Sequence, residues 1–226
     1  EGGNAMADVL SGKVNPSGQL SKTVPMKYED VPSAKSFPGK EFPEQATTGS
    51  FGRKSIPAEV TYEDGIYVGY RYYNTFNVKP AYEFGYGLSY SNFTFGNLKL
   101  SSSTFNNNIT ATLTITNPGK VAGKEVAEIY LSAPTTNLDK PAEELKAFAK
   151  TKLLKPGETQ TLKFTRTAAD LASFNTAKES WIADAGNYIV KAGASSSDIR
   201  LNATFNLPKD VVVEKDNKVL VPPTEI

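Results

Sequence analysis

The sequence contains no histidine and no cysteine among its 226 residues. These absences exclude Ser-His-Asp and Cys-His nucleophilic systems as well as thiol redox chemistry. They also exclude most zinc sites, because zinc ligands are drawn mainly from these two residue types. Any catalysis by the chain would therefore rely on carboxylates, lysine or tyrosine, and we expect no cofactor and no metal site.

Long hydrophobic runs and an excess of one charge are also lacking. The longest purely aliphatic run is three valines at residues 211–213, whereas a membrane-spanning helix needs about 20 apolar residues. The 25 basic and 24 acidic residues nearly cancel, and no basic block is present. We therefore expect no membrane span and no nucleic-acid partner, and the length allows one large or two modest domains.

The first 25 residues have the pattern of the end of an α/β layer, in which a short helix is followed by a turn at residues 15–19 and a strand at residues 20–24. Gly12 stands where a left-handed cap would end the helix. The residues of its apolar face are Ala5, Met6, Val9 and Leu10. Because a helix of two turns is not stable alone, we expect it to pack on a sheet that precedes residue 1, and we interpret the chain as a fragment of a larger protein.

Two segments of different texture follow. Residues 26–60 are rich in Pro, Gly, Ser and Lys, which predicts a long linker. Residues 62–90, here called the aromatic segment, are dense in Tyr, Phe and Gly, and either fill a core between packed layers or line a surface for a flat polar ligand such as a sugar. The alternation across residues 66–71 predicts a half-buried strand.

From residue 94 onward, short alternating runs separated by turn signals predict an immunoglobulin-like or fibronectin type III-like β-sandwich, and hence a mainly β protein. Residues 109–116 place four apolar residues on one face and four threonines on the other, as expected of an antiparallel strand with one solvent-facing side. Further strands are expected at residues 125–132, 145–154, 159–165, 181–182 and 199–207, with a helical turn within 168–174.

The run from Asp184 through Gly186 to Tyr188 matches a tyrosine corner, in which a Tyr hydroxyl binds an upstream backbone group. Since no disulfide can form, the fibronectin type III style of sandwich fits better than the antibody style. Trp181, the one tryptophan, is expected in the core rather than on a sugar-binding platform. Residues 208–226 form a tail that either adds an edge strand or stays loose.

Glycoside hydrolysis is the one reaction class that this residue set supports, because it requires only two carboxylates. No spacing identifies such a pair, and a carboxylate on a loop is usually solvated. Residues 63–65 read most simply as a turn. The candidates are Glu1, Asp8, Glu29, Asp30, Glu63, Asp64 and Glu83.

Short motifs occur in order along nearly the whole chain. They are EGGNA (1–5), ADVL (7–10), NPSGQL (15–20), TVP (23–25), GIYVGYRYY (65–73), FGYGLSY (84–90), NPG (117–119), ELKAF (144–148), LKPGE (154–158) and GASS (193–196). The motifs up to residue 25 resemble the segment that closes the α/β sandwich domain of family 3 glycoside hydrolases, the β-glucosidase and β-xylosidase type. Those in the aromatic segment resemble the next hallmark of this family, and the later ones resemble its fibronectin type III-like domain.

The resemblance implies a retaining glycosidase in which a (β/α)8-type domain supplies an Asp nucleophile and the α/β sandwich domain supplies a Glu acid/base. Both catalytic residues would lie upstream of residue 1, so no catalytic residue is expected within this chain. Glu1 matches a family glutamate on the active-site side of the second domain, and we expect it to be structural or adjacent to substrate. Arg71 and Tyr73 are expected to reach toward substrate.

These inferences divide the chain into an α/β remnant (1–25), a linker with the aromatic segment (26–93), a β-sandwich (94–207) and a tail (208–226). Val68, Tyr70 and Tyr72 are expected to pack between the layers. The expected partners are the upstream catalytic domains and a β-linked oligosaccharide or glycoside, in a secreted or periplasmic protein. Two roles compete for the sandwich: a scaffold that braces the catalytic domains and can also form a homodimer, or a carbohydrate-binding module that uses exposed aromatic rings.

Overall fold

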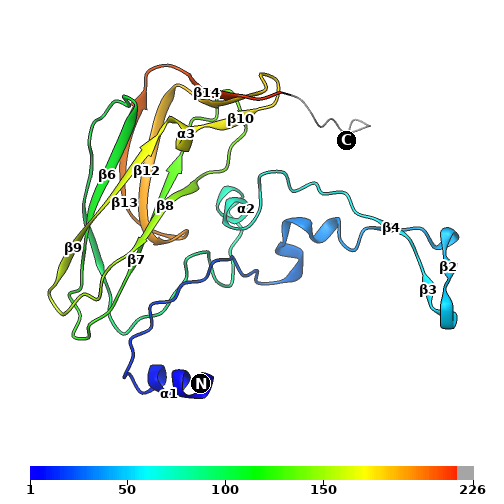
Figure 1. The fold of residues 1–226 in the computed structure, drawn as a ribbon, viewed down its shortest axis with the longest axis horizontal. Coiled ribbons are helices and arrows are strands. Elements are labelled where there is room, and N and C mark those ends of the chain that lie inside the picture. The colour runs from blue at the N-terminus through cyan, green and yellow to red at the C-terminus, as the bar shows by residue number, and fades with distance from the viewer. Residues whose placement is uncertain (218–226) are drawn as a thin grey trace.

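Alternating apolar residues build two antiparallel sheets that face each other in a sandwich (Figure 1). A computed structural model describes residues 1–217. One sheet has the order β13-β12-β7-β8, and the other has the order β5-β6-β9. The strands are β5 (Thr94–Leu100), β6 (Asn108–Thr116), β7 (Val126–Ser132), β8 (Glu144–Lys150), β9 (Thr159–Thr167), β12 (Gly186–Ser195) and β13 (Asp198–Leu207). The mainly β fold predicted from the sequence is confirmed.

Strand β6 shows how the sequence pattern produces the core. Its alternate residues Ile109, Leu113 and Ile115 are buried between the sheets, while the intervening threonines are partly exposed on the outer face. The predicted tyrosine corner is also present, because the hydroxyl of Tyr188 donates a 2.8 Å hydrogen bond to the backbone oxygen of Asp184. The short helical turn expected within residues 168–174 is α3 (Ala168–Leu171).

A third, three-stranded sheet closes one end of the sandwich in the order β10 (Ser173–Asn175), β11 (Ser180–Ala183) and β14 (Val211–Lys215). The prediction that Trp181 lies in the core is wrong, since 41% of its surface is exposed and its ring packs against that of Phe174 at 5.5 Å. Trp181 lies on an exposed face of β11, whereas the next residues, Ile182 and Ala183, are buried. Strand β14 supplies the predicted edge strand of the tail, and residues 218–226 lie outside the described part of the chain.

Strand β7 is buried on both sides. Ala127, Ile129 and Leu131 point into the sandwich core, while Glu128 and Tyr130 lie on the opposite face and are also buried. The aromatic segment covers that outer face, where the Tyr70 ring packs edge-on against Tyr130 with centroids 5.6 Å apart. The sandwich therefore has a second, smaller interior between its four-stranded sheet and the N-terminal part of the chain.

The N-terminal helix α1 (Gly2–Leu10) ends as predicted at Gly12, whose φ of +76° is left-handed. Its apolar face is uncovered, because Met6 is 65% exposed and Leu10 is 82% exposed. Figure 1 shows this helix standing apart from the sandwich. The strand expected at residues 20–24 is reduced to isolated pairings with the aromatic segment, including a bridge between Val24 and Tyr82.

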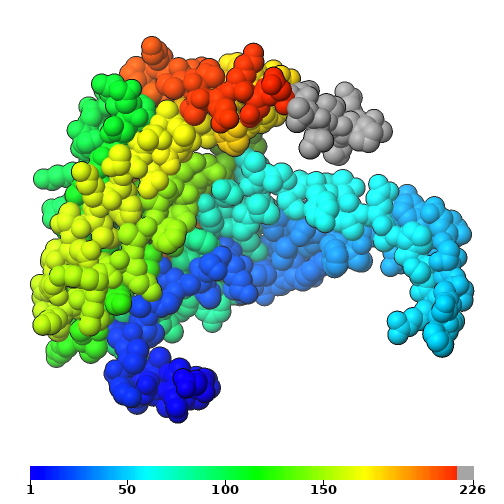
Figure 2. Space-filling model, viewed as in Figure 1, coloured from blue at the N-terminus to red at the C-terminus, as the bar shows by residue number. Residues whose placement is uncertain are grey.

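Residues 26–60 form an extended arm that reaches away from the sandwich (Figure 2). The arm contains four single 3-10 turns and two hairpin-like pairs of two-residue strands. The turns are Tyr28–Asp30, Pro32–Lys35, Pro43–Gln45 and Ser50–Gly52; the strand pairs are β1 (Lys40–Glu41) with β4 (Ala58–Glu59), and β2 (Thr47–Thr48) with β3 (Lys54–Ser55).

The prediction of a strand at residues 66–71 is wrong. Gly65 and Gly69 have positive φ values of 55° and 56°, which interrupt an extended chain, and the helix α2 (Tyr70–Thr75) begins directly after the second glycine. Tyr70 and Tyr72 are partly buried, but Val68 is 51% exposed and does not pack between layers as expected.

Candidate functional site

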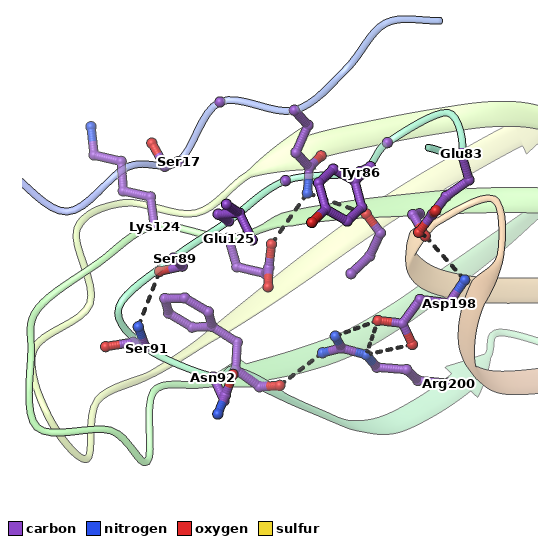
Figure 3. Close-up of a pocket in the computed structure, with 18 residues that line it drawn as sticks. Ser17, Glu83, Tyr86, Ser89, Ser91, Asn92, Lys124, Glu125, Asp198 and Arg200 are labelled. Carbon is purple, nitrogen blue, oxygen red and sulfur yellow. Dashed lines mark hydrogen bonds and ion pairs between the residues drawn. The ribbon is translucent and has the colours of Figure 1, made fainter. Parts of the chain in front are cut away.

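A pocket of about 270 Å³ lies where residues 1–90, here called the N-terminal extension, meet the sandwich, and we call it the seam pocket (Figure 3). Its walls come from residues 17–19, from the aromatic segment and the residues that follow it to 93, from residues 124–125, and from residues 194–200 at the β12–β13 turn. The chain segments approach closely here. A side chain at Gly87 would stand 2.6 Å from the backbone oxygen of Gly18, so the pocket requires glycine at this crossing.

Two amide side chains of the N-terminal extension tie it to the rest of the chain. Gln19 donates from Nε2 to the backbone oxygen of Ala194 at 3.2 Å and to Glu125 Oε1 at 3.4 Å. Asn15 donates from Nδ2 to the backbone oxygen of Ala122 at 3.1 Å and accepts at Oδ1 from the backbone N–H of Tyr90 at 2.8 Å. Both side chains bridge segments that lie far apart in the sequence, so they fix the extension on the sandwich.

The acidic groups of the seam pocket are all engaged within the chain. Glu83 accepts a 3.0 Å hydrogen bond from the Ser195 hydroxyl, and Asp198 forms a 2.6 Å ion pair with Arg200. Burial raises the pKa of Glu125, although a hydrogen bond from the backbone N–H of Val126 opposes that effect. Because these carboxylates already have partners within the chain, the seam pocket is a structural joint rather than a site with free reacting groups.

Beneath the seam pocket, the Glu128 carboxyl lies between the sheet and the aromatic segment with only 5% of its residue surface exposed. Its Oε2 accepts a 2.5 Å hydrogen bond from the Tyr130 hydroxyl. Burial raises the pKa of Glu128 to about 7, a hydrogen bond from Tyr130 opposes the rise, and the charge of Glu125 adds to it. Gly85 covers this carboxyl so closely that an added Cβ would lie 2.6 Å from Oε2.

The predicted site residues lie elsewhere. Glu1 is exposed just before α1, and its side chain makes no capping hydrogen bond. Arg71 pairs through Nη2 with Glu144 Oε1 at 3.1 Å, and Tyr73 is buried. An approach of these side chains to substrate stays a prediction. Of the seven carboxylates considered from the sequence, Glu83 is the one that lines the seam pocket.

Reasoning from the sequence did not identify Asn15, Gln19 or Glu128 as functional residues. The first two stand in a motif that marks a turn, and their bonding partners are more than 70 residues away along the chain. Glu128 stands within a strand pattern, where a polar residue normally faces solvent. The GASS motif at residues 193–196 was the available signal, because it ends β12 and leads into the turn that borders the seam pocket.

Within residues 1–217 there is no group of acidic residues placed to hold a metal ion, and no helix has the length and apolarity needed to cross a membrane. The carbohydrate-binding alternative gains no support, because a sugar platform requires roughly coplanar exposed rings. The planes of Phe174 and Trp181 are 57° apart, and those of Tyr82 and Tyr86 are 55° apart.

Comparisons with known proteins match two parts of the chain. Residues 1–90 match the family described as glycosyl hydrolase family 3 C-terminal domain, and residues 125–196 match the fibronectin type III-like domain. The chain is 35% identical over 215 residues to thermostable β-glucosidase B of Acetivibrio thermocellus, which covers 94% of the chain and 26% of that protein. It is 40% identical over 202 residues to β-glucosidase B of Emericella nidulans, which covers 88% of the chain and 23% of that protein.

Solved structures show the same fold. β-glucosidase 3B from Thermotoga neapolitana in complex with α-D-glucose is similar with a TM-score of 0.81 and 45% identity, over 94% of this chain and 27% of that one. A β-glucosidase from Paenibacillus barengoltzii is similar with a TM-score of 0.82 and 34% identity, over 99% of this chain and 24% of that one. The chain thus spans about a quarter of the length of the relatives that it matches.

Proposed function

Because the chain belongs to glycoside hydrolase family 3, as the C-terminal part of a β-glucosidase-like protein, we propose that it is a non-catalytic brace for the rest of that protein. In this proposal the sandwich is a rigid support, and residues 1–90 are the surface on which the catalytic portion rests. The whole protein is a retaining hydrolase of β-glucosides whose Asp nucleophile and Glu acid/base lie outside this chain. We propose that the protein is secreted or periplasmic, as the family resemblance implies.

The observation that carries the proposal is the uncovered apolar surface of residues 1–90. Tyr73 is the one hydrophobic residue of this region that is buried, so the region has no core of its own. An apolar surface of this extent normally belongs to an interface. Its large exposed side chains are Met6, Leu10, Val14, Met26, Tyr28, Phe37, Phe51, Ile56, Tyr62, Ile66, Val68, Phe76, Tyr82, Leu88 and Tyr90.

Hydrogen bonds to the sandwich hold this surface in place although residues 1–90 have no core of their own. The bonds of Gln19 and the hydrogen bond from Lys150 Nζ to the backbone oxygen of Ser17, at 2.6 Å, attach the chain after α1 to the sandwich. The other end of the region is attached through Tyr70, whose hydroxyl accepts from the backbone N–H of Leu145 at 2.8 Å. A partner that packs on the extension is thereby fixed relative to the sandwich.

Assay of the isolated chain against an aryl β-glucoside tests the non-catalytic role. We expect no release of the aryl group above the buffer rate, because the family resemblance implies that both catalytic carboxylates lie outside this chain. Turnover by the purified chain that disappears in Glu1→Gln would refute the proposal, since Glu1 is the family-matched carboxylate. A Glu59→Gln variant, altered in the exposed arm, is the control for activity lost during purification.

A charge placed on α1 tests separately whether residues 1–90 are the surface on which the catalytic portion docks. In the isolated chain, Leu10→Glu is expected to leave the unfolding temperature unchanged, because Leu10 is 82% exposed. In the full-length protein the same change is expected to lower both the unfolding temperature and the hydrolytic rate, since the charge would enter an apolar contact. Ser21→Glu, which adds the same charge at an exposed polar position, is the matched control. Equal behaviour of Leu10→Glu and the control in the full-length protein would contradict the docking role.

A further inference from the structure

We propose that the free edge of strand β9 pairs with the same strand of a second copy of this chain, so that the two β5-β6-β9 sheets join into one continuous sheet. Strand β9 is the outermost strand of its sheet. The N-terminal extension lies on the other sheet, where Tyr70 packs against Tyr130, and Figure 1 shows the extended arm on the opposite side of the sandwich from β9. The proposal therefore does not rest on the brace role.

Half of the backbone N–H and C=O groups of β9 point away from β6. The two strands pair over residues 159–167 in one unbroken antiparallel register. Alternate residues of such a strand bond to the neighbouring strand, and the residues between them face outward. The Asn117 N–H donates to the Glu158 oxygen at 3.0 Å, so the even-numbered residues face β6 and Thr161, Lys163 and Thr165 face outward. Within residues 1–217, no turn or loop accepts a hydrogen bond from these three N–H groups.

The other sheet is protected at both of its edges. At β8 a bulge interrupts the pairing with β7, and the Leu145 N–H is occupied by the Tyr70 hydroxyl at 2.8 Å. At β13 a preceding loop covers the edge, with a bridge between Thr104 and Asn206. Bulges and covering segments are the usual means by which proteins prevent pairing between sheet edges. Strand β9 has a regular register instead, so its edge is the one prepared for another strand.

Charge selects one register for two copies of β9. Pairing centred on Lys163 would place this residue opposite its own copy, and like charges that face each other destabilise a strand pair. Pairing centred on Leu162 places Lys163 opposite Thr161 of the second copy and still brings outward-facing residues together. In that register Glu158 lies opposite Arg166 of the second copy. Two-fold symmetry repeats this contact at the other end of the interface.

The charged residues at the two ends of β9 are available for this exchange. Glu158 is paired with Lys152 and Arg166 with Asp170, and the side chains of both pairs are partly exposed. Exposed ion pairs contribute little stability, so they can be replaced by pairs across an interface. Because one strand supplies both members of each complementary contact, a second copy fits the edge better than an unrelated strand does.

A lysine at position 161 tests the pairing. In the proposed register Thr161→Lys places two lysines opposite each other at two symmetric positions, and Thr161 is exposed, so the fold is spared. We expect the full-length protein and the 226-residue chain to sediment with the mass of two copies, and Thr161→Lys to weaken dimerisation roughly tenfold. Thr94→Lys, the same change at an exposed position of β5 on the other edge of this sheet, is the matched control and is expected to leave the dimer unchanged.

A second change tests the register itself. Thr161→Lys combined with Lys163→Glu places a lysine opposite a glutamate of the second copy, and is expected to restore dimerisation, whereas pairing centred on residue 163 would oppose two glutamates. Failure of this rescue, an equal effect of Thr94→Lys, or a monomeric wild-type protein at its highest soluble concentration would overturn the proposal. A full-length monomer beside a dimeric 226-residue chain would also overturn it for the whole protein, and would show that the preceding part of the protein covers β9.

Discussion

Replacement of Glu128 by Gln tests the energetic role of the carboxyl buried beneath the seam. Its pKa is raised from 4.5 to about 7, so the folded chain binds this proton more tightly than the unfolded chain does. Stability therefore falls as the pH rises from about 4.5 to about 7 and stays level above that range. At about 1.4 kcal/mol for each pH unit, this separation of pKa values corresponds to a loss of at most about 3.5 kcal/mol.

The lack of histidine makes this measurement unusually direct, because no other side chain in the chain ordinarily titrates between pH 5 and 8. Unfolding by urea, followed by circular dichroism at several pH values across this range, is the appropriate assay. The wild-type chain is expected to lose stability toward pH 7. Glu128→Gln is expected to lose most of that slope and to be more stable than wild type at pH 8, since the amide can still accept the bond from Tyr130.

Two further carboxyls define the controls. Burial also raises the pKa of Glu125, so a small slope that remains in Glu128→Gln reports Glu125. A hydrogen bond from Lys152 lowers the pKa of Glu158, which is therefore ionised in both states above pH 5, and Glu158→Gln should keep the wild-type slope. A wild-type stability that is level or rising from pH 5 to 7, or an unchanged slope in Glu128→Gln, would refute the reasoning.

Three other substitutions probe the framework by urea unfolding. Tyr188→Phe removes the corner hydrogen bond and is expected to cost about 1 kcal/mol; a cost near zero would show that the bond adds nothing. Lys140→Met leaves the buried Asp184 without its 2.6 Å ion-pair partner and is expected to cost about 3–5 kcal/mol, so a neutral effect would contradict the buried pair. Gly85→Ala forces a Cβ against the seam and is expected to cost about 1–3 kcal/mol, whereas Gly3→Ala, with open space around it, should be neutral or slightly stabilising.

The sandwich was predictable because its signals are local. Alternation with a period of two places Ile109, Leu113 and Ile115 on one side of β6 whatever the rest of the chain does. The corner at Tyr188 is similarly contained within a few residues of β12. The resemblance of short motifs then predicted the family, although it did not identify the contacts between the N-terminal extension and the sandwich.

The errors arose where geometry depends on distant residues or on backbone conformation. The alternation across residues 66–71 was read as a strand, but left-handed glycines at 65 and 69 turn the chain into α2. Trp181 was expected in the core rather than on a sugar-binding platform, yet a short end sheet leaves its face of β11 uncovered. Gln19 acquires its role only where segments more than 100 residues apart meet, and Glu128 only where β7 meets Gly85 of the aromatic segment, so no local pattern encodes either contact.

Because β7 is buried on both of its faces, it should tolerate fewer amino-acid substitutions than β6. Along β6, every second position faces outward and can accept many residues, so a library covering all substitutions would show tolerance that alternates along the strand. Along β7, residues 126–131 are buried without interruption, and intolerance should be continuous. Engineering for heat or solvent resistance therefore has room on the sheet that contains β6, while β7 can be redesigned only together with the aromatic segment that covers it.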